Sequence, residues 1–250
     1  MGRTILVGAH RGAVRYAPEN TLAAFDKAIE LDTYRIECDV RRSRDGHLVL
    51  FHDATVDRMS DGAGRVCDLT LEELKRLRIG GAEFASTTSI ATLAEAIEHV
   101  KGRCRLLVEL KDDGTAADVV AEIERTDMVE ACTISAFDED MLVRAKELQP
   151  RLGTACFLTT PRPFDAQDVV SRLGISMLIV WPRAVVPEQI ADAKRAGLHI
   201  RCGFPDTMTY DETFASFRRL ADMGVDEMAC GRPDWIAQMA QEYARNAPAS

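Results

Sequence analysis

Short apolar runs alternate with amphipathic stretches along the chain, and this alternation predicts strands that are each followed by a helix. Thr4–Ala9 has the continuous apolar character of a buried strand, whereas Thr21–Leu31 repeats its apolar residues at helical spacing. Asn20 is the predicted N-cap of that helix, because its side chain can accept a hydrogen bond from a free backbone amide of the first turn. The chain is therefore expected to open with a strand, a polar loop and a helix.

A hairpin and a loop-rich segment follow this first helix. Tyr34–Val40 and Leu48–His52 are predicted strands, and the Arg-Asp-Gly sequence at 44–46 predicts a tight turn between them. Residues 53–90 have little periodicity and contain one short predicted helix near Leu71–Leu77. We interpret 53–90 as an insertion after the second strand.

The remainder of the chain alternates regularly between helices and strands. The predicted elements cover 92–100, 104–110, 116–125, 131–135, 139–148, 153–158, 165–172, 177–181, 187–196, 198–202, 211–222, 225–229 and 233–245. With the hairpin strand set aside, eight strands alternate with helices, which favours an α/β fold, the closed (β/α)8 TIM-type barrel. No Gly-x-Gly-x-x-Gly follows the first strand, which weakens the dinucleotide-binding alternative. We expect one barrel domain over residues 1–250, with the insertion at about 53–90.

Composition narrows the choice of partners. With 46% hydrophobic and 28% charged residues, the chain is neither disordered nor collagen-like. No apolar run reaches the roughly 18 residues of a membrane-spanning helix. The first apolar run ends at His10, too early for a signal peptide, so a cytoplasmic location is expected. A net charge of −9 disfavours nucleic acids and anionic membranes as partners, and a small anionic substrate would need local cations or a metal.

Seven cysteines lie far apart in the sequence, at positions 38, 67, 104, 132, 156, 202 and 230. No Cys-x-x-Cys pair or Cys/His zinc spacing occurs. Most of them fall in apolar runs, so we expect buried, reduced side chains that pack as small hydrophobic groups.

Three acidic residues are expected to converge at the carboxyl end of the barrel, where this fold builds its active site. Side chains alternate along a strand, so Glu37 and Asp39 share one face, and the apolar face opposite must pack on the helices. Both carboxylates then point into the barrel mouth with their Cα atoms about 6–7 Å apart. Glu109 on strand 104–110 faces the same way. Oxygen ligands favour a hard cation, Mg²⁺ or Ca²⁺, over zinc or copper.

Two histidines and two basic residues complete the candidate site. His10 follows the first strand and His52 ends the hairpin strand, and an imidazole exchanges its proton near neutral pH. Arg11 offers a planar fork to phosphate oxygens, and Lys111 offers a point charge. One histidine can take the proton of a nucleophile while the other protonates a leaving alkoxide, and a metal would neutralise charge on the phosphorus oxygens. The set predicts phosphoryl-transfer chemistry.

Short motifs recur in a fixed order along the chain. They are His10-Arg11-Gly12, Pro18-Glu19-Asn20-Thr21, Glu37-x-Asp39, Asp45-Gly46, His52-Asp53, Thr55-Val-Asp-Arg58, Gly62-x-Gly64, Leu69-Thr70-Leu71, Thr92-Leu93, Glu109-Leu-Lys111 and Ser135-x-Phe137. In order and spacing they resemble the glycerophosphodiester phosphodiesterase family, densely over the first 111 residues and thinly beyond them.

The resemblance implies a TIM-type barrel with a small insertion after the second strand. It implies metal-dependent hydrolysis of a small glycerophosphodiester to glycerol 3-phosphate and an alcohol. The resemblance implies that His10 and His52 are the acid–base pair. It implies that one divalent cation, Mg²⁺ or Ca²⁺, is bound by Glu37, Asp39 and Glu109. The implied phosphate contacts are Arg11 and Lys111.

Alternatives to this function stay open at the level of the sequence. One is a phospholipase D-like lyase that forms a cyclic phosphate, and another is a non-catalytic barrel that binds a phosphorylated metabolite. The sequence does not determine which histidine is the acid and which is the base. It also does not determine whether the nucleophile is water or a glycerol hydroxyl. A homo-oligomer is equally open.

Structural roles compete with the catalytic ones. The two acids of strand 34–40 could pair with Arg35 or Arg41, and Lys111 could pair with Glu109 alone. Glu19 fits helix initiation as well as contact with the ligand region.

The C-terminal third departs from the family. Members often carry Trp-Thr-x-Asn on the seventh strand, where this chain has Arg201-Cys202-Gly203-Phe204-Pro205-Asp206. These positions lie on the wall expected to hold the alcohol, so the resemblance does not define that alcohol. Ser135 and Phe137 are expected to pack at a strand end, and Trp181 to be buried.

Overall fold

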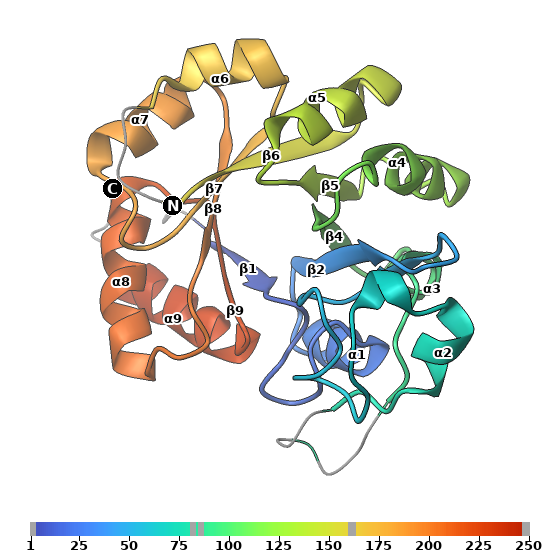
Figure 1. Cartoon of the computed structure of the whole chain (residues 1–250). Coiled ribbons are helices and arrows are strands. Elements are labelled where there is room, and N and C mark those ends of the chain that lie inside the picture. Colours follow the sequence, from blue (N-terminus) through green and yellow to red (C-terminus); the bar gives the residue numbers. More distant parts are fainter. Residues whose placement is uncertain (1–3, 81–83, 85–87, 160–163, 247–250) are drawn as a thin grey trace.

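The computed structural model describes residues 4–80, 84, 88–159 and 164–246. Within these residues, eight parallel strands form a closed barrel in which β1 pairs with both β2 and β9 (Figure 1). The barrel strands are β1 (Leu6–Ala9), β2 (Arg35–Arg42), β4 (Arg105–Leu110), β5 (Cys132–Ser135), β6 (Gly153–Leu158), β7 (Met177–Val180), β8 (His199–Gly203) and β9 (Glu227–Cys230). The predicted (β/α)8 barrel is confirmed.

Helices surround the barrel and connect its successive strands (Figure 1). They are α1 (Leu22–Glu30), α3 (Leu93–Val100), α4 (Ala116–Arg125), α5 (Glu139–Leu148), α6 (Ala166–Leu173), α7 (Pro187–Arg195), α8 (Tyr210–Met223) and α9 (Pro233–Asn246). Every element predicted from the sequence is present, with its ends within two residues of the predicted ones. No helix in the described ranges is long and apolar enough to cross a membrane.

The predicted N-cap of α1 is wrong by one residue. Thr21, not Asn20, caps the helix, because its Oγ1 accepts a hydrogen bond from the amide of Ala24 at 3.2 Å. Asn20 has a left-handed backbone with φ of +57°, and its side chain turns to β2 instead. A tertiary hydrogen bond has thus replaced the local one that the capping rule assumes.

Alternation along the strands separates the apolar core from the barrel interior. On β2, Ile36, Cys38 and Val40 are fully buried in the core shared with the helices. Glu37 and Asp39 occupy the opposite face, as the alternation predicts. β4 repeats the pattern and lies in register with β2, so that Asp39 pairs with Glu109. Two adjacent strands therefore bring their acids to one level of the barrel.

The hairpin strand β3 (Leu48–Leu50) pairs antiparallel with β2. The turn before it needs Gly46, whose φ is +90°. The chain continues into a 3-10 helix at Val66–Asp68, which the sequence did not predict, and into α2 (Leu71–Arg76). The segment buries a core of its own, made of Val49, Phe51, Val56, Val66, Leu74, Ile79 and Ile90. Residues 81–83 and 85–87 of the predicted insertion lie outside the described ranges.

A buried charge cluster lies in the barrel around Glu227 of β9. Its carboxylate contacts Arg201, Nε of Arg35 at 3.1 Å and Nε2 of His199 at 3.0 Å. Burial and the neighbouring Arg35 lower the pKa of His199 to about 4 and that of Arg201 to about 9. Gly8 leaves room for this cluster, since a Cβ there would lie 2.5 Å from the Arg201 guanidinium. The structural alternative, in which Arg35 pairs with the acids of β2, is therefore not found among the described residues.

The cysteines follow the prediction of burial with two exceptions. Cys67 is exposed and Cys104 is partly exposed, whereas the other five are buried. None of the seven, all of which lie in the described ranges, forms a disulfide. Cys67 lies in the 3-10 helix Val66–Asp68, whose buried residue is Val66.

Candidate active site

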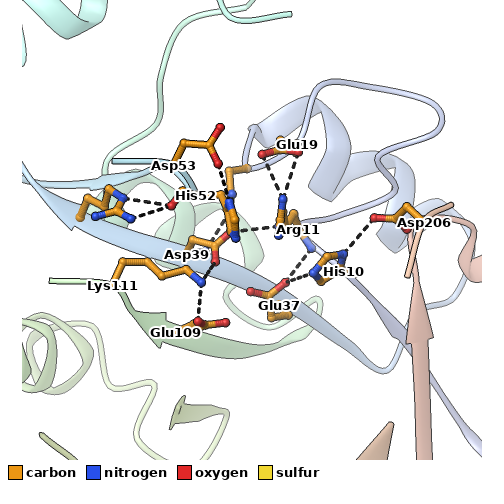
Figure 2. Close-up of polar contacts among 12 residues, drawn as sticks. His10, Arg11, Glu19, Glu37, Asp39, His52, Asp53, Glu109, Lys111 and Asp206 are labelled. Carbon is orange, nitrogen blue, oxygen red and sulfur yellow. Dashed lines mark hydrogen bonds and ion pairs between the residues drawn. The ribbon is translucent and has the colours of Figure 1, made fainter. Parts of the chain in front are cut away.

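The carboxylates of Glu37, Asp39 and Glu109 meet inside the barrel mouth, with one oxygen from each within 4.8 Å of the others (Figure 2). All three residues are buried. The alternation of β2 and β4 and their mutual register bring them together. Sequence reasoning thus placed these three acids in one cluster.

The three carboxylates repel one another, because they are buried close together. Burial and the neighbouring Asp39 raise the pKa of Glu37 to about 7, and the same two causes raise the pKa of Glu109. Burial opposes ionisation of Asp39 too, but Lys111 and Arg11 outweigh it and hold the pKa of Asp39 below its ordinary value. Oε1 of Glu37 is buried and has no hydrogen-bond partner among the residues that the structure describes. An orphaned carboxylate oxygen in an all-oxygen site fits a divalent cation such as Mg²⁺ or Ca²⁺.

Lys111 lies between two of the acids. Its Nζ is 3.0 Å from Oδ1 of Asp39 and also contacts Glu109. From the sequence, Lys111 could either form a structural ion pair with Glu109 or contact the phosphate of the substrate. Lys111 and Glu109 line the cavity, and Asp39 lies directly behind Lys111, so the ammonium group is part of the site's charge balance.

Arg11 reaches the same carboxylates from the loop after β1. Its Nε is 3.3 Å from Oδ2 of Asp39, and its backbone amide donates to Oε2 of Glu37 at 2.8 Å. The backbone of Arg11 has φ of +55°, a conformation that non-glycine residues adopt rarely. Nη1 of Arg11 also contacts Glu19 at 3.3 Å. Glu19 therefore holds Arg11 in place.

His10 stands at the end of β1 with its two ring nitrogens in different surroundings (Figure 2). Nδ1 is 3.0 Å from Oδ2 of Asp206, and Nε2 is 4.0 Å from Oε2 of Glu37. Asp206 is fixed in turn by the backbone amide of Gly231, which donates to its Oδ1 at 2.6 Å. Burial alone would lower the pKa of His10, but the hydrogen bond to Asp206 and the charge of Glu37 outweigh it and raise the pKa.

His52 has an equivalent arrangement on the other side of the carboxylates. Its Nδ1 is 2.7 Å from Oδ1 of Asp53, and Nε of Arg58 binds Oδ2 of Asp53 at 2.5 Å. Arg58 also binds Glu19, at 2.7 Å. Burial lowers the pKa of His52; at Asp53 burial acts the other way, but Arg58 and His52 bring the pKa of that carboxyl down to about 2. The ion pair of Arg58 with Glu19 thus joins Asp53, the partner of His52, to the partner of Arg11.

Two further side chains position the loop and the strand around the site. Nδ2 of Asn20 donates to Oδ2 of Asp39 at 2.8 Å, and the amide of Asp39 donates to Oδ1 of Asn20 at 3.0 Å. Arg41 donates to the backbone oxygen of His52 at 3.0 and 2.8 Å and pairs with Asp112 at 2.5 Å. The structural alternative, in which Arg41 pairs with the acids of β2, is therefore not found in the described part of the chain. Arg41 instead fixes the backbone that carries His52.

The seven predicted site residues all lie in or beside one cavity of about 430 Å³. Six of them line it directly, and Asp39 lies behind Lys111 and Arg11. Ser135, Phe137 and Trp181 also line it. Ser135 is fully buried at the end of β5, as expected, and Phe137 stacks on Phe157 but is 59% exposed. The expectation of a buried tryptophan is wrong, because Trp181 is 50% exposed. A strand-end pattern does not reveal whether the next layer covers a side chain, so the sequence holds no signal for this exposure.

Asp206, Arg58 and Asn20 are the functional candidates that residue reasoning missed. Asp206 is 196 positions from His10, so no local pattern connects them. Arg58 and Asn20 belong to motifs noted in the sequence, and only their tertiary contacts reveal what they support.

Comparison with known proteins gives one consistent result. Residues 10–235 match the model of the Glycerophosphoryl diester phosphodiesterase family. A glycerophosphodiester phosphodiesterase of Caldanaerobacter subterraneus subsp. tengcongensis is 32% identical over 95% of this chain and 98% of its own length. The crystal structure of a glycerophosphodiester phosphodiesterase from Agrobacterium tumefaciens has 30% identity and a TM-score of 0.80, covering 93% of this chain and 99% of that one. A phosphodiesterase from Oleispira antarctica, solved with the product sn-glycerol-3-phosphate, has 28% identity and a TM-score of 0.81, with 95% of this chain and 97% of that one covered.

Proposed function

The chain belongs to the Glycerophosphoryl diester phosphodiesterase family and is a glycerophosphodiester phosphodiesterase, and on this premise we propose that two histidines transfer protons beside one divalent cation. The products are glycerol 3-phosphate and an alcohol. One observation carries the proposal: two carboxylate-anchored imidazoles line the same cavity as two members of a cluster of three converging acids.

Glu37, Asp39 and Glu109 would hold the cation, Mg²⁺ or Ca²⁺. The orphaned Oε1 of Glu37 and the all-oxygen donor set support this assignment. A bound divalent cation supplies Lewis-acid stabilisation of the negative charge on the phosphate oxygens.

Arg11 and Lys111 are the phosphate contacts in this proposal. Both cations line the cavity and face the acids, so they also reduce the repulsion that those acids exert on an anionic substrate. The Arg11 guanidinium can bind two phosphate oxygens at once, whereas Lys111 contributes one charge without a fixed orientation.

The hydrogen bonds of the two imidazoles define their proton chemistry. When Nδ1–H of His10 or His52 donates to its carboxylate, the neutral ring keeps its lone pair on Nε2. One neutral imidazole accepts the proton of the attacking hydroxyl at Nε2. The other ring, protonated, donates its Nε2 proton to the departing alkoxide, so that the alcohol leaves neutral.

The test is hydrolysis of several glycerophosphodiesters with chelator, with Mg²⁺ and with Ca²⁺, followed by phosphorus NMR. Glycerol 3-phosphate released only in the presence of a metal is the expected result. Accumulation of a cyclic phosphate would identify the lyase, and binding without turnover would identify a non-catalytic phosphometabolite barrel.

A further inference from the structure

The cavity has two chemically different sides. The charged side comes from β1, β2, β4 and the end of the hairpin, and it contains the predicted site residues. The opposite side comes from β5 to β8 and from the residues directly after β5, β7 and β8, with Phe137, Phe157, Ile179, Trp181 and Phe204 as its apolar wall. A phosphodiester bound between the two sides would place its two ester groups in unlike surroundings.

Two rings of the apolar wall are exposed to solvent. The rings of Phe137 and Phe157 stack with centroids 4.2 Å apart and planes 4° from parallel. Phe137 is 59% exposed and Trp181 is 50% exposed, although both line the cavity. Large apolar side chains that stay exposed at a cavity wall are typical of a ligand-binding surface.

Two smaller residues mark the limits of this wall. Ser135 pairs in register with Glu109, and its buried hydroxyl has no hydrogen-bond partner among the described residues. Gly203 lines the cavity on β8, and a Cβ built there would have no heavy atom of the described residues within 4 Å, its chain neighbours aside. Ser135 thus lies at the border with the charged side, and Gly203 leaves space beside Phe204.

We propose that the alcohol released from the substrate is a hydrocarbon alcohol, and that the apolar wall binds it. This inference rests on the proposed hydrolysis. The glycerol arm carries hydroxyl groups that need hydrogen-bond partners, and the charged side provides them. The other arm then lies on the wall, where burial of apolar surface stabilises it.

A cationic alcohol such as choline fits the wall less well. A quaternary ammonium is held by several ring faces around it, and one face each of Phe137 and Phe157 is taken up by their mutual stacking. Among the described residues, the wall itself includes no carboxylate to pair with the cation.

The experiment compares three diesters of glycerol 3-phosphate: with 1-octanol, with glycerol and with choline, all below micelle-forming concentrations. We expect kcat/KM for the octyl ester to exceed that for the glycerol ester at least tenfold. Equal or faster hydrolysis of the glycerol or choline ester would overturn the inference while leaving the proposed function intact. Hydrolysis of none would refute the proposed function. Calorimetric binding of octyl phosphate against glycerol 3-phosphate then tests the wall independently, and no preference for octyl phosphate would overturn it.

Two variants change the wall in opposite ways. Trp181→Ala removes apolar surface from an exposed position, and Gly203→Leu fills the open space. Both should reduce the octyl-to-glycerol ratio of kcat/KM to near one. Val186→Ala is the matched control, since Val186 is an exposed apolar residue after β7 that does not line the cavity. An unchanged ratio in both wall variants would contradict the assignment.

Discussion

Oδ2 of Asp206 lies 3.0 Å from Nδ1 of His10, although 196 positions separate the two residues. The loop after β8 therefore orients a histidine at the end of β1. Because the carboxylate both holds the ring and stabilises its protonated form, the contact connects the far side of the barrel to the proton chemistry.

Replacing Asp206 by asparagine should lower kcat about tenfold, because the ring loses its charged partner. The carboxylate raises the pKa of His10, so its removal should shift the limb of the pH–rate profile that reports His10 to lower pH. Steady-state kinetics from pH 5 to 9 measure both effects. Asp211→Asn, at an exposed position on α8, is the control, and an unshifted profile in D206N would exclude a positioning role.

Loss of either imidazole should be far more severe. His10→Ala and His52→Ala are each expected to reduce turnover on the order of 10²-fold or more, since general acid or base catalysis contributes about that factor. His47→Ala, an exposed histidine in the hairpin turn, should retain wild-type turnover. Whichever of the two site variants kept most of its activity would remove that histidine from the mechanism.

The ionised acids of the cluster should bind the cation but lower the folding stability of the metal-free protein. The pKa of Glu37 is raised to about 7, so its ionisation destabilises the metal-free fold increasingly between pH 4.5 and 7. Glu37→Gln should therefore raise the thermal midpoint in the presence of chelator at pH 8, but not at pH 4. Calorimetry should also show at least tenfold weaker affinity for Mg²⁺ or Ca²⁺. Unchanged metal affinity would refute the ligand assignment.

Much of this site follows from alternation along strands. Glu37, Asp39 and Glu109 share a face because side chains alternate, and parallel strands in register bring the faces together. The capping rule placed Asn20 on the helix because it considers only neighbours in sequence, whereas Asp39 offered the side chain a buried charged partner. The partnership of Asp206 with His10 depends on closure of the barrel, which pairs β1 with β9. Local patterns hold no information on such a contact.

The charge cluster around Glu227 should make stability depend on pH through His199. An unfolded histidine has a pKa of about 6.5, whereas burial and Arg35 lower the pKa of His199 to about 4 in the folded chain. Between these values the unfolded chain binds more protons, so the free energy of unfolding should fall as the pH is lowered from 6.5 to 4. The loss is on the order of 2 kcal/mol, since each pH unit contributes at most about 1.4 kcal/mol per proton.

His199→Gln keeps a donor for Glu227 and removes the titration, so urea unfolding at pH 7, 6, 5 and 4.5 should show a smaller decline in the free energy of unfolding than in the wild type. His47→Gln, at an exposed position, serves as the control. An H199Q variant that lost stability as steeply as the wild type would place the acid sensitivity elsewhere, with the carboxylates of the site as the next groups to test.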